Sequence, residues 1–178
     1  MDFMVLTQDY FLNRATELAP DLVGKLLCRQ VDGEILRLRI LETECYFGQE
    51  DTACHAHKGR TPRTDVMYLE GGRAYIYLCY GMHNLLNLTT GAEGHPEAVL
   101  IRGLEGVCGP GRLTKRMSID RSLNTCLLCP ENQLWVEDDG VRLPFLATPR
   151  VGIGYASEED QARPWRFVAE TEKEKKYR

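Results

Sequence analysis

Apolar and polar residues alternate over several short segments of the chain, which is the pattern of β-strands with one buried face. The longest such segment starts at Glu34 and follows an apolar segment over Leu26–Val31. The two are joined by Asp32–Gly33, a dipeptide that favours the tight turn of a β-hairpin. Because side chains on a strand repeat with a period of two, one face of the longer strand carries Leu36, Leu38, Ile40, Glu42, Glu44 and Tyr46.

A second hairpin is predicted in the middle of the chain. Its strands cover residues 74–80 and 84–90, with Gly81–Met82 at the tip, and a further apolar strand covers residues 98–104. Hairpins join antiparallel neighbours, so these segments predict a mostly antiparallel sheet.

Three segments predict helices on the outside of this sheet. Thr7 can cap an amphipathic helix that ends before Pro20. A short second helix is expected from Pro20 or Asp21 to about Gly24, and a short basic helix over residues 111–119. The pattern therefore predicts an α+β fold in which peripheral helices cover the sheet.

The composition is typical of one globular domain, with 178 residues of which 43% are hydrophobic and 27% charged. No stretch approaches the roughly 20 apolar residues of a membrane-spanning helix. The first residues include Asp2 and Asp9 and lack the basic start of a secretory signal, so the seven cysteines favour free thiols in a reducing compartment. We therefore expect a protein that is not secreted, cytoplasmic if bacterial and nuclear if eukaryotic, with a domain over residues 1–169 and a charged tail over 170–178.

Charge is distributed unevenly along the chain. The net charge of −4 argues against nucleic-acid binding when the chain is taken as a whole. Residues 54–121 nevertheless carry a net charge of +3, whereas residues 1–53 carry −5 and residues 122–178 carry −2. Two basic clusters beside glycine-rich backbone suit phosphate contacts, although an ordinary charged surface explains either one alone: Lys58, Arg60 and Arg63, and Arg112, Lys115 and Arg116.

The strand that begins at Glu34 ends in two acids at the edge of an apolar face. Glu42 and Glu44 lie about 7 Å apart along a strand. A carboxylate at the edge of an apolar surface with a like charge nearby has a raised pKa, so Glu44 could take a proton from water near neutral pH. The alternative is a pair of solvated acids at a strand end.

Aromatic residues concentrate on the predicted sheet. Tyr75 and Tyr77 share one face of their strand, and Tyr46 lies on another strand. These rings could pack a core, or they could form a pocket in which a nucleobase stacks. Tyr80 and Met82 at the hairpin tip fit a core less well, because an exposed apolar wedge is what unstacks base steps from the minor groove.

Evidence for a metal site is weak. Cys54, His55 and His57 form a Cys-His-x-His run, and Cys126 and Cys129 form a single Cys-x-x-Cys, whereas structural zinc usually needs four ligands in paired spacings. The chain also lacks the glycine-rich motifs of dinucleotide and nucleoside triphosphate binding, and it lacks a Gly-x-Ser-x-Gly nucleophile elbow.

Taken together, several blocks of the sequence resemble the alkyladenine DNA glycosylase family, the 3-methyladenine DNA glycosylases of the mammalian type. They occur in the family's order and spacing up to Phe167, so the resemblance covers nearly the whole chain. The blocks are residues 39–55, 60–64, 75–87, 98–102, 109–113 and 148–153, and the ending at residues 164–167.

The resemblance implies a role for each matching residue. Glu44 would activate the attacking water, and Arg102 would help to hold that water. The residues that would bind the extruded base are Tyr46, His55 and Tyr77, with Asn87 at the pocket mouth discriminating against the 2-amino group of guanine. Tyr80, with Met82 beside it, would fill the space that the base leaves. The implied fold is a single α+β domain with a curved antiparallel sheet and a protruding hairpin.

The leading hypothesis is therefore a monofunctional DNA glycosylase that starts base excision repair. It would act as a monomer on duplex DNA from the minor groove, without a metal or cofactor, and would remove 3-methyladenine, 7-methylguanine, hypoxanthine or ethenoadenine. We expect contacts to the DNA backbone from Arg60, Arg63, Arg112 and Lys115. Two alternatives are a non-catalytic protein that binds damaged DNA and a zinc-dependent hydrolase that uses Cys54, His55 and His57.

Overall fold

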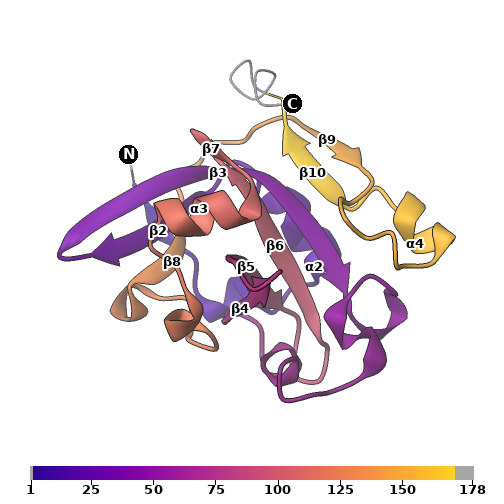
Figure 1. Ribbon diagram of the computed structural model, residues 1–178. Helices are drawn as coiled ribbons and strands as arrows, with labels where there is room; N and C mark the ends of the chain where they lie inside the picture. The colour runs from indigo at the N-terminus through magenta and orange to yellow at the C-terminus, as the bar shows by residue number, and fades with distance from the viewer. Residues whose placement is uncertain (1, 171–178) are drawn as a thin grey trace.

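The computed structural model describes residues 2–170 of the chain, and within them the strands form one curved, antiparallel sheet (Figure 1). The main path of the sheet has the order β1-β8-β2-β3-β6-β5-β4, with β10 and β7 pairing to β3 and β6, and β9 to β10. The strands are β1 (Met4–Val5), β2 (Leu26–Val31), β3 (Glu34–Phe47), β4 (Ala74–Cys79), β5 (His83–Thr90), β6 (Glu97–Leu104), β7 (Val107–Cys108), β8 (Leu134–Asp138), β9 (Phe145–Thr148) and β10 (Arg166–Ala169).

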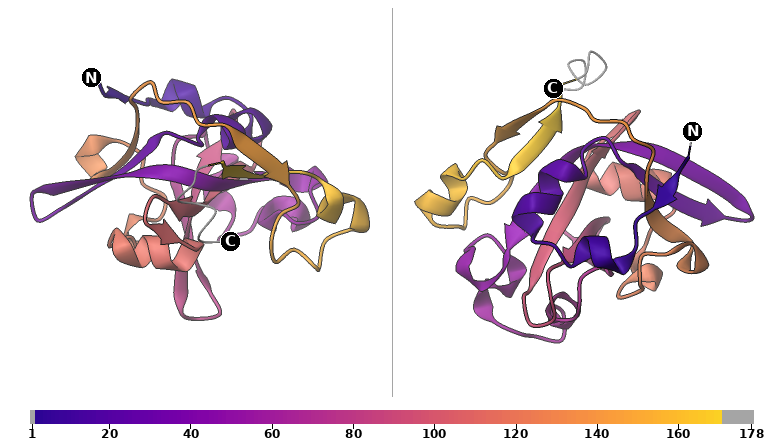
Figure 2. Two further views of the ribbon diagram at one scale, coloured as in Figure 1. Left: turned by 90° about the horizontal axis from the view of Figure 1, so that it is seen from above. Right: turned by 180° about the vertical axis from the view of Figure 1, so that it is seen from behind.

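The helices are short and lie outside the sheet, as predicted. The left view of Figure 2 shows the N-terminal helices on one face of the sheet, and α3 and the β4–β5 hairpin on the other. The α-helices are α1 (Gln8–Phe11), α2 (Ala15–Asp21), α3 (Pro110–Arg116) and α4 (Glu158–Ala162). The 3-10 helices are η1 (Gly48–Glu50), η2 (His55–Lys58), η3 (Asp65–Tyr68), η4 (Arg121–Leu123) and η5 (Pro130–Asn132).

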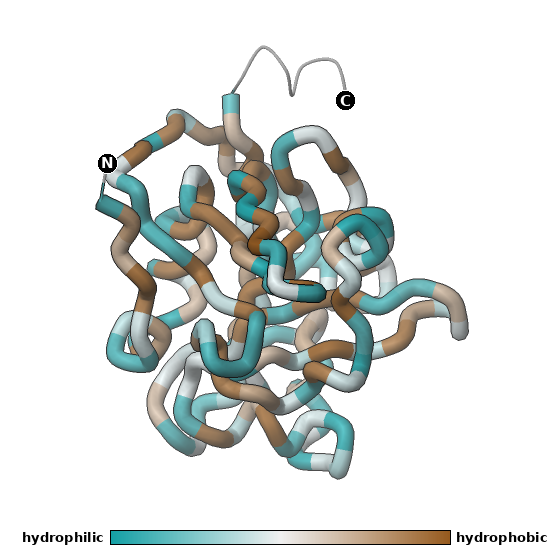
Figure 3. Tube along the Cα trace, turned by 90° about the vertical axis from the view of Figure 1, so that its left-hand side faces the viewer, coloured by the Kyte–Doolittle hydropathy of each residue, from teal (hydrophilic) through white to brown (hydrophobic). Residues whose placement is uncertain are grey.

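Both predicted hairpins are confirmed. Val31 pairs with Glu34 across Asp32–Gly33, whose φ angles of 51° and 80° are those of a tight hairpin turn. In the second hairpin Cys79 pairs with His83, so Tyr80 belongs to the turn rather than to the strand predicted over residues 74–80. Figure 3 shows this hairpin projecting at the right of the view, and along the tube hydrophobic and hydrophilic residues alternate.

The prediction for the N-terminal helices is wrong in its boundaries. One helix was expected from Thr7 to before Pro20, but the chain forms α1 and α2 with an extended residue, Arg14, between them. The backbone N–H of Gly91 donates to the carbonyls of Phe11 and Asn13, so contacts with a distant loop end α1. Pro20 lies inside the last turn of α2, and the separate helix expected after it does not form.

The long strand β3 organises the molecule, because it pairs along both edges. On one edge its first half pairs with β2 and its second half with β10, while the other edge pairs with β6. On the face of β3 toward α2, the hydroxyl of Thr43 donates a hydrogen bond to the carbonyl of Ala19 at 2.6 Å. The core of the domain lies between this strand, β6 and the N-terminal helices. The opposite face of β3 is left for Glu42, Glu44 and Tyr46.

No helix within residues 2–170 has the length and hydropathy needed to cross a membrane. The charged tail predicted over residues 170–178 lies outside the described residues except for Glu170.

Candidate active site

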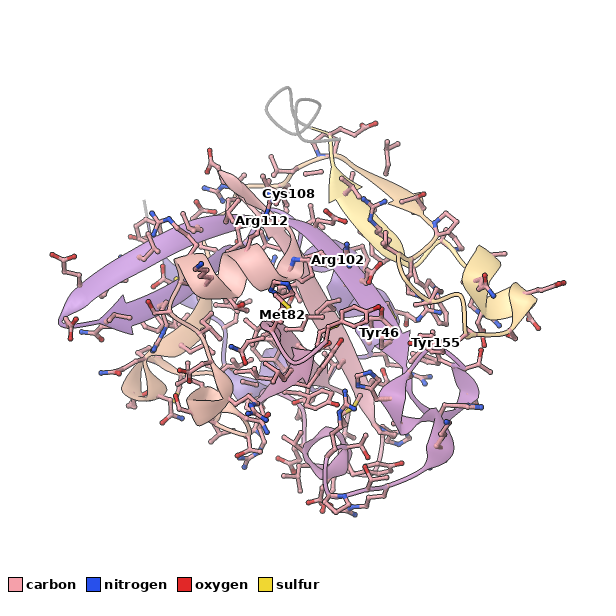
Figure 4. The ribbon with its side chains drawn as sticks, in the orientation of Figure 1. Tyr46, Met82, Arg102, Cys108, Arg112 and Tyr155 are labelled. Atoms are coloured by element: carbon pink, nitrogen blue, oxygen red, sulfur yellow. The ribbon has the colours of Figure 1, made fainter. Side chains whose placement is uncertain are left out.

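A cleft of about 620 Å³ opens on the face of the sheet that carries the β4–β5 hairpin. Segments that are far apart in the sequence form its walls: β3, η2, β4, β6, the start of α3 and the connection after β9. Figure 4 shows Tyr46, Arg102, Arg112 and Tyr155 on this face, around the hairpin tip that carries Met82. Its lining includes Tyr46, His55, Arg63, Tyr77, Arg102 and Tyr155.

Glu44 is completely buried beside this cleft, where β3 passes under it. Its Oε2 accepts a hydrogen bond from the backbone N–H of Val151 at 2.7 Å, and its Oε1 accepts one from the hydroxyl of Tyr46 at 3.0 Å. Arg102 places Nη1 at 3.8 Å from the same Oε1. Both carboxylate oxygens are therefore held in fixed positions, as expected of a group that must meet a reactant in one geometry.

The pKa of Glu44 lies above that of an ordinary glutamate. Burial raises it, and Arg102, the Val151 N–H and the Tyr46 hydroxyl lower it in part. Glu42 raises it slightly through like-charge repulsion, as the sequence predicted, but burial is the larger cause. The interpretation of a solvated pair of acids is wrong, because Glu42 is also buried.

A β-bulge aims Arg102 at the two acids. The pairing of β3 with β6 runs from Ile40–Leu104 to Glu42–Gly103 and then to Thr43–Ile101, so it skips Leu41 on β3 and Arg102 on β6. An extra residue in a strand bends it and redirects its side chain. Arg102 donates from Nε to Glu42 at 3.2 Å and thereby lies between Glu42 and Glu44.

Aromatic rings form one wall of the cleft. The rings of His55 and Tyr77 have their centres 4.6 Å apart, and those of Tyr75 and Tyr77 5.5 Å apart. A smaller cavity behind this wall is also lined by Tyr46. Tyr46 connects the aromatic wall with Glu44, since its ring lines the cavity and its hydroxyl donates to Glu44. These rings offer flat apolar faces of the kind on which bases stack.

Arg63 lies in this wall, which the sequence did not predict. Its Nε donates to the Tyr75 hydroxyl at 3.2 Å, and its guanidinium carbon lies 5.0 Å from the Tyr77 ring centre. The Tyr75 hydroxyl also lies 2.9 Å from Nδ1 of His55. Burial, and secondarily the charge of Arg63, lower the pKa of His55 to about 4, so the imidazole is neutral at pH 7.

Asn87 lines the smaller inner cavity and is buried, so it lies deeper than the predicted position at the pocket mouth. Its side-chain amide donates to the carbonyl of Tyr75 at 3.2 Å. It lies opposite Tyr75 on β4, in the part of β5 that also pairs with β6.

The hairpin tip has the exposure that the sequence predicted. Tyr80 is 91% exposed and Met82 is 74% exposed. The tip is supported from the side by α3, whose Thr114 hydroxyl donates to the carbonyl of Asn84 at 2.7 Å. Gly111 permits this approach, because a Cβ there would lie 2.9 Å from the side chain of His83.

The other predicted basic residues lie on α3 and in the loop between η2 and η3. Arg112 lines the cleft, and Lys115 is exposed on α3. Arg60 is exposed but already paired, since its Nε lies 2.5 Å from Asp65 and its guanidinium lies over the ring of Tyr68.

Sequence reasoning missed the segment after β9, which closes one side of the cleft. Arg150 is buried and forms a two-fold hydrogen-bonded ion pair with Asp51, at 2.6 and 2.9 Å. This anchor places the next residue, Val151, where its N–H meets Glu44. Tyr155 lines the cleft and donates its hydroxyl to the carbonyl of Ala53. The Thr-Pro-Arg-Val-Gly-Ile block was the signal, but a backbone donor leaves no mark on residue type.

The donors considered for zinc are not gathered in one place. Cys54 is buried with its Sγ toward the carbonyl of Pro96, His55 faces Tyr75, and Nδ1 of His57 lies 2.6 Å from the carbonyl of Gln49. Among residues 2–170, no three His, Cys, Asp or Glu side chains form a group suited to a metal ion. Cys126 and Cys129 are both free thiols.

Comparison with known proteins agrees with this geometry. The model of the methylpurine-DNA glycosylase family matches residues 9–108 and 107–173. The chain is 44% identical to a protein of Methanocella arvoryzae, over 92% of this chain and 91% of that protein. It is 43% identical to a protein of Psychrobacter cryohalolentis, over 90% and 89%, and 40% identical to one of Borreliella afzelii, over 92% and 95%. All three are named "Putative 3-methyladenine DNA glycosylase". The chain belongs to the methylpurine-DNA glycosylase family.

Proposed function

We propose that this protein is a monofunctional DNA glycosylase that removes alkylated or deaminated purines by means of a water molecule activated by Glu44. The single observation that carries the proposal is the buried carboxylate of Glu44, held at both oxygens beside a cleft with aromatic walls. The names of the relatives point to 3-methyladenine as one substrate. Hypoxanthine, 7-methylguanine and ethenoadenine are the further candidates.

The proposed reaction breaks the bond between C1′ of the deoxyribose and the purine nitrogen. The departing base takes the bonding electrons, and the sugar acquires oxocarbenium character, much as in glycoside hydrolysis. Ionised Glu44 stabilises that positive charge and takes a proton from water, whose oxygen then bonds to C1′. Arg102, 3.8 Å from Glu44, favours the ionised carboxylate and helps to hold the water.

Base recognition is proposed to depend on the aromatic wall. A purine turned out of the duplex would stack between Tyr46 on one side and His55 and Tyr77 on the other. Alkylated purines that carry positive charge gain additional attraction from such rings. Neutral His55 adds no opposing charge. Asn87, at the inner end, would disfavour a base with a 2-amino group, so 7-methylguanine is expected to be removed more slowly than purines without that group.

A base stacked inside a duplex cannot reach this cleft, so the nucleotide must be flipped out at a cost of a few kcal/mol. We propose that the exposed tip enters from the minor groove, with Tyr80 filling the vacated space and Met82 beside it. Arg112 and Lys115 would contact the flanking phosphates. The protein would work as a monomer, in the compartment that holds the DNA.

No lysine is present among the described residues that line the cleft, which supports hydrolysis by water rather than attack by an amine. The base would therefore be released, and the abasic sugar would stay in an uncut strand. A non-catalytic protein that binds damaged DNA is the alternative. The buried Glu44 with Arg102 beside it argues against that role, because binding a base requires neither.

The test is single-turnover cleavage of duplexes that each contain one hypoxanthine or one ethenoadenine, together with methylated DNA. The parent protein is expected to produce abasic sites that break only after alkali. Glu44→Gln is expected to lower the rate by a factor of about 10² to 10⁴ while duplex binding persists. Binding without cleavage of any substrate by the parent would instead support the non-catalytic role, and strand breaks without alkali would contradict a monofunctional enzyme.

A further inference from the structure

Glu42, the second buried acid on β3, makes contacts that the proposed reaction does not use. Its Oε1 accepts hydrogen bonds from Nε of Arg102 at 3.2 Å and from Nε of Arg166 at 2.5 Å. Arg166 comes from β10, on the other edge of β3 from Arg102. Through this one oxygen atom, Glu42 links the strands on both sides of β3 close to Glu44.

Glu42 is also the group that holds Arg102 in place. A long arginine side chain has many rotamers, so it needs a partner to keep one position. At 3.8 Å the approach of Nη1 to Glu44 is an ion pair beyond hydrogen-bond distance, whereas Nε donates to Glu42 within it. The hydrogen bond to Glu42 therefore sets the direction in which the guanidinium points.

Packing leaves Glu42 little freedom of its own. Gly103 is its partner on β6, and a Cβ at position 103 would lie 3.1 Å from the Cβ of Glu42. Val168 is its partner on β10. Because the φ angle of Gly103 is not in the left-handed region, its small size rather than its flexibility is what matters at this position.

We propose that Glu42, itself held by Arg166, is a positioning residue that fixes the guanidinium of Arg102 beside Glu44 and the attacking water. The positive charge of Arg166 compensates the negative charge of Glu42. The positive charge of Arg102 therefore remains available to stabilise ionised Glu44. This inference rests on the proposed function, because it assigns a role in a reaction that Glu44 carries out. Glu42 itself touches no substrate.

The proposal can be tested through the pH dependence of cleavage, because the rate falls on the acid side as Glu44 is protonated. The charged and titratable groups around this site are Glu42 and Tyr46 on β3, Arg102 on β6, Arg166 on β10, and Arg150 and Tyr155 in the segment after β9. Of these, Arg102 has the largest effect in favour of the ionised form of Glu44.

Two substitutions of Glu42 are expected to differ in their effect on the acid limb. Glu42→Ala frees Arg102, so ionised Glu44 loses support and the limb moves to higher pH. Glu42→Gln keeps a carbonyl oxygen, which suffices because both arginines donate to one atom. Since Gln removes only the repelling charge, the limb stays or moves to lower pH. The maximal single-turnover rate is expected to fall about 100-fold in Glu42→Ala, as for a misplacement of about 1 Å, and to recover largely in Glu42→Gln.

A double-mutant cycle shows whether Glu42 acts through Arg102. In an Arg102→Ala background, Glu42→Ala is expected to have little further effect on the rate. Glu137→Ala is the matched control, because Glu137 is an equally buried carboxylate paired with an arginine, Arg37, away from the cleft. It is expected to lower stability without moving the acid limb.

Gly103→Ala provides a second approach that changes no charged group. It is expected to push Glu42 aside and to move the acid limb upward as Glu42→Ala does. Circular dichroism of each variant separates misfolding from mispositioning. Independent effects of Glu42→Ala and Arg102→Ala, or an acid limb that does not move in Glu42→Ala and Gly103→Ala, would overturn the inference while leaving the proposed function intact. A parent protein without glycosylase activity would overturn both.

Discussion

Burial shifts the pKa of two ionisable residues at the cleft, and in both it disfavours the charged form. Burial raises the pKa of Glu44, which makes it a better proton acceptor once it is ionised. Burial lowers the pKa of His55 to about 4. Nδ1 of His55 faces the Tyr75 hydroxyl at 2.9 Å and Nη2 of Arg63 at 3.5 Å. Because an arginine can only donate, Nδ1 is the acceptor and the ring stays neutral.

This shift of His55 predicts how stability changes with pH. Between its ordinary pKa of 6.5 and about 4, the unfolded chain binds a proton that folded His55 does not. The free energy of unfolding is therefore expected to fall as pH drops through this window. Urea unfolding at several pH values checks this. His55→Gln is expected to flatten the slope, whereas His57→Gln, which alters an exposed histidine of the same 3-10 helix, is not. Equal slopes for all three proteins would contradict the assignment.

At the scale of elements, the β4–β5 hairpin and α3 form one unit that presents the tip. The hairpin alone is two strands and a short turn, which is a marginal structure in water. Packing of α3 against it, through Gly111 on His83 and Thr114 on Asn84, gives it lateral support. The exposed Tyr80 is thus presented on a supported element, although its own side chain contributes little to the fold.

Tyr80→Ala is therefore expected to impair function without affecting stability. Loss of a stacking contact of about 1–3 kcal/mol would lower cleavage of duplex substrates by about tenfold or more. The free energy of unfolding is expected to change by no more than about 0.5 kcal/mol, because the residue is exposed.

Single-stranded substrate has no vacated space to fill, so its cleavage is expected to fall less. Ile35→Ala, at an exposed position of the other hairpin, is the control. An equal loss on both substrates would argue against a wedge.

At the scale of the whole molecule, the charge is negative but the proposed DNA face is not. The chain has a net charge of −4, while the segment that supplies the hairpin and α3 has a net charge of +3. Two acids at β8, Glu137 and Asp139, lie in ion pairs with arginines of β3, and β8 lies toward the opposite end of the sheet order from the hairpin. We therefore expect DNA binding that depends on a few localised phosphate contacts.

The salt dependence of binding checks this distribution of charge. Arg112→Ala and Lys115→Ala are each expected to reduce the slope of log K against log salt concentration by about 1. Arg142→Ala is expected to leave the slope unchanged, because Arg142 pairs with Asp138 and lines no part of the cleft. Slopes that are unchanged for Arg112 and Lys115 would place the phosphate contacts elsewhere.

Much of the fold could be predicted, because local signals agreed with tertiary structure where β-strands were concerned. The period of two placed Glu42, Glu44 and Tyr46 on one face, and Asp32–Gly33 marked a turn. The helical prediction failed at Leu12–Arg14, where hydrogen bonds from the distant Gly91 outweighed local preference.

The candidate site could be predicted only in part. Glu44 and Arg102, which were predicted to act together, lie 3.8 Å apart in the structure. Features that depend on backbone geometry were not predicted: the N–H of Val151, and the bulge at Arg102. The position of Arg63 in the aromatic wall was also not predicted, because a basic residue close to glycine and proline in the sequence suggests an exposed loop.

The dependence of β3 on partners from the end of the chain has a consequence for the order of folding. The first half of β3 finds its neighbour β2 within a few residues, but its second half pairs with β10, more than a hundred residues later. Contacts across such separations form slowly. Until Val151 and Arg166 have been synthesised and have docked, Glu42 and Glu44 lack two of their donors. The nascent chain can therefore assemble most of its sheet early, while the contacts around Glu42 and Glu44 are completed only after residues 151–166 have been synthesised.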